Sequence, residues 1–155
     1  MPLSASTPFY AFQKKVGPWV AKANTAVTIN LGDMLMWDSG AVTPVTASSD
    51  ASKFVGICEG QIPISSNVDN QIGLENQVRV NDNGVFLMDT TNGDTLVHGD
   101  AVKIGATPQM VVKDSTDATI VGYVWLPDGT SIVGNPGTRC PIRIRVNYPE
   151  KEFAS

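Results

Sequence analysis

The sequence predicts an all-β protein, a compact barrel or sandwich of about ten to twelve short strands with a duplicated hairpin and an extended N-terminal arm. Gly and Pro together supply 24 of the 155 residues, which favours many turns. No window combines helical periodicity with capping residues. The third observation is a repeat, because Gly32–Trp37 (GDMLMW) returns as Gly99–Ile104 (GDAVKI), 67 residues later.

The repeat continues beyond these hexapeptides. After a loop, each copy shows Asp-Ala, one or two residues, an apolar residue, Val and Gly, as Asp50–Gly56 and again as Asp117–Gly122. The period is too long for a solenoid, and two copies are too few. The pattern suits a β-hairpin duplicated within one domain. Since it contains no catalytic motif, it favours a scaffold over an enzyme.

Short apolar runs between turn residues define the strands of the first half. The Gly32-Asp33 pair predicts a turn, and Asp38-Ser39-Gly40 predicts another. Gly56 lies inside a strand pattern, where it marks a bulge or a close backbone approach. Residues 61–76 are polar and predict a surface loop. The predicted strands are 27–30, 34–37, 41–46 and 53–59, with Val27 and Ile29 on one face of the first.

The second half opens on Asn83-Gly84, a strong hairpin signal because both residues tolerate the positive φ of a type I′ turn. We therefore expect 78–80 and 85–88 to pair across it. The second repeat occupies 99–124, and turns follow at 127–129 and 135–137. In the last strand Ile142, Ile144 and Val146 alternate with Arg143 and Arg145, giving an apolar and a basic face.

Residues 1–25 are predicted to form the arm, 26–148 the β-domain and 149–155 a polar tail. Prolines at 2, 8 and 18 obstruct regular structure, yet aromatics crowd this segment. A purely disordered tail is poor in aromatics. The arm is therefore predicted to dock on its own domain, on a sister subunit or on another protein. The predicted partner-binding residues are Phe9, Tyr10, Phe12, Lys14, Lys15 and Trp19.

The charge is unevenly distributed. The chain carries a net charge of −4, yet its first 30 residues hold three lysines and no acid. An acidic body argues against nucleic acid as a partner. No apolar run approaches a membrane span, and no signal peptide is visible. We expect synthesis in a reducing cytoplasm, with Cys58 and Cys140 as buried free thiols.

Residue types that carry catalysis are sparse. His98, the only histidine, precedes a predicted turn and lacks a nucleophile motif, so it is interpreted as a solvated turn residue. Neither a zinc set, an EF-hand nor a phosphate-binding loop is present, and no cofactor is expected. A carboxylate pair acting as in a glycosidase stays open in principle. The acids that adjoin Gly, Asn or Ser are interpreted as turn residues: Asp33, Asp38, Asp82, Asp94, Asp100 and Asp128.

Two further features are singled out. Trp37 and Trp125 end apolar strands in corresponding halves and are predicted to be core or subunit-interface residues. The basic face made by Arg143 and Arg145 either grips a partner carboxylate or is solvated or paired within its own sheet.

Six short motifs follow one another along the chain: Gly32-Asp33, Phe54–Ile57, Val78–Val80, Gly84–Phe86, Gly99–Ile104 and Val121–Tyr123. In this order they resemble small head-decoration (capsid cement) proteins of tailed bacteriophages. The resemblance spans about residues 30–126 and rests on order and spacing, because each motif is short. It implies a β-rich, non-enzymatic virion protein that decorates and stabilises the outer surface of an icosahedral head. Its partners would be the major capsid protein and sister subunits in a homotrimer.

Two alternatives stay open. A tail- or fibre-associated module that binds host glycans or proteins would gather its surface aromatics on loops. A hydrolase would need two carboxylates converging in a pocket. Co-purification with heads, with tails or with neither separates the three hypotheses.

Overall fold

The computed structural model describes residues 19–24, 26–47, 49, 51–62, 77–90, 93–114 and 119–146. In these residues the chain is all-β, as predicted, with twelve strands and a short 3-10 turn, η1 (Ala51–Lys53). The strands are β1 (Trp19–Lys22), β2 (Met34–Asp38), β3 (Ala41–Pro44), β4 (Phe54–Ile62), β5 (Gln77–Asn81), β6 (Val85–Thr90), β7 (Thr95–Val97), β8 (Ala101–Ile104), β9 (Met110–Lys113), β10 (Ile120–Val124), β11 (Ser131–Val133) and β12 (Arg139–Ile144).

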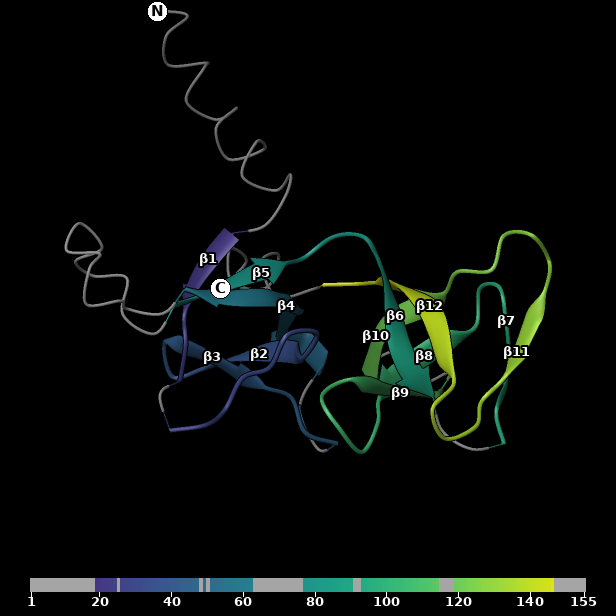
Figure 1. Cartoon of the computed structure of the whole chain (residues 1–155), viewed down its shortest axis with the longest axis horizontal. Helices are drawn as coiled ribbons and strands as arrows, with labels where there is room; N and C mark the ends of the chain where they lie inside the picture. The colour runs from purple at the N-terminus through teal and green to yellow at the C-terminus, as the bar shows by residue number, and fades with distance from the viewer. Residues whose placement is uncertain are drawn as a thin grey trace, which may run out of the picture.

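The fold consists of two five-stranded units with the same topology. The second unit is a closed barrel in the order β10-β12-β6-β9-β8, sealed by parallel pairing of β6 with β9. The first has the order β1-β5-β4-β2-β3, and its two end strands meet through a parallel bridge between Ala23 and Val42. We call them the first and second barrel, and they lie side by side along the long axis in Figure 1.

Strand by strand, β1 to β5 correspond to β6, β8, β9, β10 and β12. Every ladder of the first barrel has an antiparallel counterpart in the second. The duplication predicted as a hairpin therefore extends to a whole barrel. A separate two-stranded ribbon, β7 with β11, belongs to the second half alone and lies at its far end in Figure 1.

The repeated Gly-Asp pair builds the same turn twice. Gly32 and Gly99 both have φ of 90°, a region that favours glycine. In each turn the aspartate carboxylate accepts a hydrogen bond from the backbone amide three residues earlier. The distance is 2.8 Å from Asn30 N to Asp33 Oδ2 and 2.9 Å from Val97 N to Asp100 Oδ2. The sequence motif is therefore a structural signature of the barrel.

The repeated Val-Gly pair reflects a close approach between strands. A Cβ at Gly56 would lie 2.4 Å from the carbonyl oxygen of Asn81 on β5. A Cβ at Gly122 would lie 2.6 Å from that of Arg143 on β12, the corresponding strand. The ladder shifts register beside each glycine, so the predicted bulge and close approach at Gly56 are both confirmed.

Two hydrophobic clusters fill the molecule. One lies inside the first barrel and contains Leu35, Val55 and Val80. The larger cluster combines second-barrel residues such as Val102 and Ile142 with residues of β2, β4 and their connection. The first-barrel members of this larger cluster are Met34, Val45, Ala51, Phe54 and Ile57. The larger cluster therefore extends across the junction and packs the barrels together.

The Asn83-Gly84 hairpin prediction is wrong. β5 pairs with β1 and β4, whereas β6 pairs with β12 and β9, so Asn83-Gly84 links the two barrels. Each flanking strand finds two neighbours within its own barrel, which outweighs the local turn preference. The tight hairpin with positive φ at both central residues lies instead at Ser39-Gly40, with φ of 51° and 84°.

The predicted strand 27–30 is also absent. Asn24 and Asp33 side chains accept bonds from the amides of Ala26 and Asn30, so local contacts replace a ladder. Ile29 is buried, but Val27 is 43% exposed, so they do not share one covered face.

The boundary drawn at residue 25 needs correction. β1 lies within the predicted arm, forms four register pairs with β5 and contributes the buried Ala21. The first barrel therefore includes residues 19–22, which the predicted boundary assigned to the arm.

Candidate functional site

The structure describes only one of the residues predicted to bind a partner. Trp19 begins β1, where its backbone is opposite Val80 on β5. The other five lie outside the described residues: Phe9, Tyr10, Phe12, Lys14 and Lys15.

A different surface stands out on the outside of the second barrel, across β6, β12 and β10. Leu87 is opposite Pro141, and the amide of Trp125 donates to the Pro141 carbonyl, so these three residues form one row. The next row contains Val85, Arg143 and Tyr123. We call these two rows the β6-β12-β10 face; β6 and β12 cross the front of the second barrel in Figure 1.

This face exposes apolar side chains. Leu87 is 65% exposed, Val85 39% and Trp125 38%. The intervening residues of the strands point into the core, with Met88, Cys140 and Ile142 fully or almost fully buried. An exposed cluster of large apolar residues on a sheet face is typical of an interaction surface.

Trp125 is held between two neighbours. Its ring lies edge-on to His98, with centroids 5.1 Å apart, and the Arg143 guanidinium carbon lies 5.3 Å from its ring centroid. The His98 ring is fixed in turn, because its Nδ1 accepts a bond of 3.0 Å from the amide of Leu126. Trp125 is therefore not a core residue of the chain, contrary to that part of the prediction. Its role at an interface stays a prediction.

The arginines around this face differ in their partners. Arg139 Nε bonds Asp89 at 3.1 Å, and Arg145 Nη1 donates to the Tyr123 hydroxyl at 3.0 Å. Within the described part of the chain, no carboxylate forms an ion pair with Arg143. Arg145 is therefore bonded inside its own sheet, which is one of the two predicted roles, and Arg143 lies over the Trp125 ring. Binding of a partner carboxylate by this face stays a prediction.

The corresponding face of the first barrel is mostly polar. Arg79 on β5 is opposite Val20 on β1, and Lys22 is opposite Gln77. The carboxylate of Glu59 on β4 accepts a bond of 2.6 Å from the side-chain Nδ2 of Asn81.

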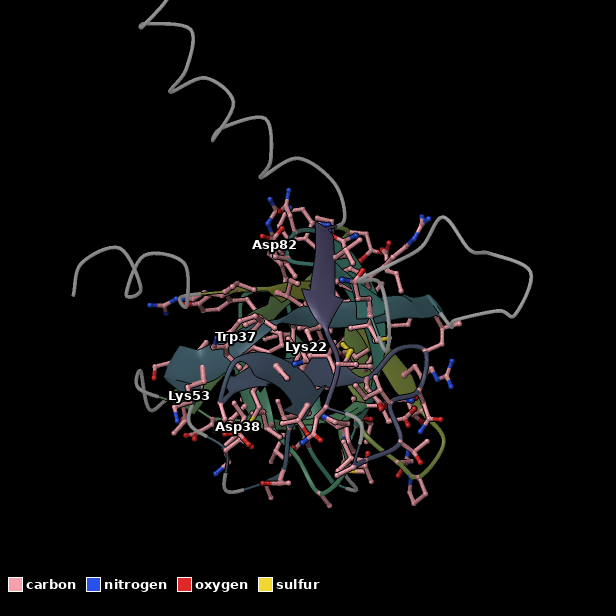
Figure 2. The ribbon with its side chains drawn as sticks, turned by 90° about the vertical axis from the view of Figure 1, so that its left-hand side faces the viewer. Lys22, Trp37, Asp38, Lys53 and Asp82 are labelled. Carbon is pink, nitrogen blue, oxygen red and sulfur yellow. The ribbon has the colours of Figure 1, made fainter. Side chains whose placement is uncertain are left out.

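Figure 2 looks onto the outer side of this barrel. There the charged Lys22, Asp38 and Lys53 are labelled together with Trp37. Trp37 is half-buried and packs against the inner cluster of the barrel, which agrees with its prediction as a core residue in part.

The barrels are joined by a specific polar contact. Gln109, in the β8–β9 hairpin, donates through Nε2 to the Asp33 carboxylate at 3.0 Å and to the Leu31 carbonyl at 3.2 Å. The Met34 amide donates to the Pro108 carbonyl at 2.7 Å. Asp33 is 3% exposed, and both of its carboxylate oxygens accept bonds. The Gly-Asp turn of the first barrel is therefore also a docking point for the second.

Two cysteines and one turn aspartate among the candidate residues have shifted pKa values. Burial raises the pKa of Cys140 to about 11, assisted by the charge of Asp100, and burial also raises the pKa of Cys58. Both thiols are free and buried, as predicted. Bonds from the Thr130 hydroxyl and amide hold the pKa of Asp128 below its ordinary value, as suits a turn residue.

Among the residues described here, no group of three or more His, Cys, Asp or Glu is arranged to hold a metal ion. The described segments also include no helix long and apolar enough to span a bilayer.

Comparison with protein-family models, with curated proteins and with solved structures found no match.

Sequence reasoning missed the β6-β12-β10 face because 85–88 is a continuous apolar run, which hides the alternation between inward and outward residues. A usable signal existed in 139–143, where Arg, Pro and Arg alternate with the apolar Cys140 and Ile142. It places the outward residues of β12 at odd positions. Pairing with β6 then identifies Leu87 as an outward residue, but that pairing is long-range and has no local signature.

Proposed function

We propose that this chain is a non-enzymatic structural protein of a tailed-phage virion, which decorates and stabilises the outer surface of the icosahedral head. The major capsid protein is its partner on the shell, and sister subunits complete a homotrimer. The observation that carries the proposal is the β6-β12-β10 face, an exposed apolar and aromatic surface on a rigid barrel.

The resemblance gains physical meaning from the fold. Its Gly-Asp and Val-Gly motifs coincide with the turns and close strand approaches that both barrels need. They therefore indicate an architecture, and the proposed function draws on that architecture through the resemblance to head-decoration proteins. Asp33, Asp100 and Asp128 each accept a bond from a backbone amide of their own turn, which suits a scaffold.

The proposed mechanism is linkage. A protein that binds the intact shell more tightly than the loosened one shifts the equilibrium towards the intact particle. In a trimer, three modest contacts on one rigid unit act together, because the second and third form intramolecularly.

The test is co-sedimentation of the purified protein with intact heads that lack decoration, with isolated tails as the parallel sample. We expect saturable binding to heads and a higher temperature of head disruption when the protein is bound. Binding to neither particle contradicts the proposal. Light scattering tests the oligomer, and a monomer at all concentrations contradicts the trimer.

One observation favours a second function, a tail- or fibre-associated host-binding module. Trp125 is 38% exposed, and an exposed indole is a stacking platform for sugars as well as for proteins. Binding to tails or to host-surface glycans, without binding to heads, selects this alternative.

A further inference from the structure

We infer that the β6-β12-β10 face binds an extended protein segment that places a carboxylate on Arg143 and an apolar side chain, two residues away, over Leu87 and Pro141. The inference deepens the proposed function by giving the chemistry of the partner. It rests on that proposal only for the identification of the partner as capsid protein.

The guanidinium of Arg143 is the part of this face that would bind a carboxylate. Its guanidinium lies 5.3 Å from the Trp125 ring centroid, and it takes part in no ion pair within the described residues. Stacking on an indole orders the planar fork while leaving its N–H donors available. A carboxylate matches that fork through two parallel bonds. Arg143 is therefore oriented for an acid that the described chain does not supply.

The spacing of Pro141 and Arg143 along β12 matches the spacing of alternate residues in an extended ligand. Pro141 and Arg143 are two residues apart on β12 and point outward, while Ile142 between them is fully buried. Outward residues on one strand are about 7 Å apart, which is also the spacing of residues i and i+2 in an extended ligand. A segment running along β12 with an acid and an apolar residue at that spacing therefore reaches both groups at once.

Beside Arg143 lies the apolar row of Leu87, Pro141 and Trp125. Leu87 is 65% exposed and lies beside Pro141, with Trp125 on the other side of β12. An apolar side chain placed over this row removes aliphatic and aromatic surface from water, at about 25 cal/mol per Å². A sugar can stack a C–H face on the indole but has no aliphatic side chain to place over Leu87, and a nucleic acid backbone has none either. The row thus favours protein as the source of the carboxylate.

Charge complementarity limits the partner further. The whole chain has a net charge of −4, so a long polyanion is repelled. Near this face, however, Asp89 is engaged by Arg139, and Arg143 has no anionic counterpart among the described residues. One or two carboxylates on a short segment satisfy this local excess without meeting the acidic remainder.

The experiment uses the full chain labelled with nitrogen-15 and two synthetic peptides. In one peptide Glu and Leu alternate at every second position, with Thr between them, and in the other Gln replaces Glu. The indole N–H signals of Trp19, Trp37 and Trp125 are assigned by single Trp→Phe variants. We expect the Glu peptide to shift the Trp125 signal and leave Trp37 unchanged, and the Gln peptide to bind about tenfold more weakly.

Three variants locate the site. Arg143→Gln should abolish the difference between the two peptides, and Leu87→Ser should weaken both equally. Arg79→Gln, on the corresponding strand of the first barrel, is the matched control and should change neither. All three residues are exposed or outward-facing, and thermal melting checks that each variant folds.

Undecorated heads are the second probe. If heads bind the wild-type protein and the Arg143→Gln and Leu87→Ser variants equally, the inference is overturned while the proposed function stands. If the peptides discriminate as expected but heads do not bind, the inference stands and the proposed function fails.

Other occupants give distinct results. Self-association that disappears in Arg143→Gln, with no peptide binding, identifies a second copy as the occupant and overturns the inference. A Trp125 shift caused by oligosaccharides and not by the Glu peptide overturns it in favour of a glycan.

Discussion

The two barrels share one strand order and differ in what they present to the outside. Position by position, Glu59 of the first barrel corresponds to Trp125 of the second, and Arg79 corresponds to Pro141. The inward residues of both barrels stay apolar. The two barrels have in common the glycines, the capping aspartate and the buried alternation, whereas the residues of the outer face differ.

A second difference is between the first-barrel face at the junction and the equivalent face of the second barrel. Met36 and Val45 pack in the cluster that joins the barrels, whereas their counterparts Lys103 and Asp114 form an ion pair of 3.5 Å. The apolar version is covered by the second barrel.

The largest expected effect comes from removing β1. Deletion of residues 1–22 eliminates the four-pair ladder with β5 and should abolish cooperative folding of the first barrel. Deletion of 1–18 keeps the strand and should change the free energy of unfolding by no more than about 0.5 kcal/mol. Circular dichroism melting compares the two.

The same pair of truncations tests the predicted arm. We expect the protein lacking 1–18 to lose binding to undecorated heads while it stays folded. Lost stability with retained head binding would show that the arm serves its own domain. A normal melt after deletion of 1–22 would contradict the assignment of β1 to the first barrel.

The next effect tests the shared close approach. Gly56→Ala and Gly122→Ala should each lower the free energy of unfolding by about 2–3 kcal/mol, because the added Cβ meets the carbonyl of the neighbouring strand at 2.4 and 2.6 Å. Gly137→Ala is the control. It has φ of 85° but open space around it, so it carries only the backbone cost of about 1–2 kcal/mol. A smaller loss for Gly122→Ala than for the control would refute a shared steric requirement.

The Gly-Asp turns should respond unequally. Asp33→Ala removes a buried acceptor from Gln109 and from the Asn30 amide, and should cost about 1–3 kcal/mol. Asp100→Ala removes a partly exposed cap and a surface ion pair with Lys113, and should cost about 1 kcal/mol or less.

A double-mutant cycle isolates the bond between the barrels. Asp33→Ala combined with Gln109→Ala should show a coupling free energy of about 1 kcal/mol in denaturant unfolding. Additive effects would mean that this bond does not hold the barrels together.

The smallest expected difference concerns the tryptophans. Trp37→Ala should lower the free energy of unfolding by about 1–2 kcal/mol, since Trp37 packs against the inner cluster. Trp125→Ala should cost less than about 1 kcal/mol because Trp125 lies on the outer face of the barrel and is 38% exposed, yet it should weaken partner binding. Equal losses of stability would show that Trp125 is as much a core residue as Trp37.

Local sequence determined the all-β class, the Gly-Asp turns, the close approach at Gly56 and the free buried thiols, because each depends on backbone conformation or on alternation over a few residues. The repeat of GDMLMW as GDAVKI was visible for the same reason. Tertiary structure decided the rest.

Tertiary structure assigned β1 to the first barrel, separated β5 from β6 despite Asn83-Gly84, and placed Leu87, Pro141 and Trp125 in one row. These outcomes depend on which strands pair across long stretches of chain. Such pairing is settled by the closure of two barrels, which satisfies more backbone bonds and buries more apolar surface than any local hairpin.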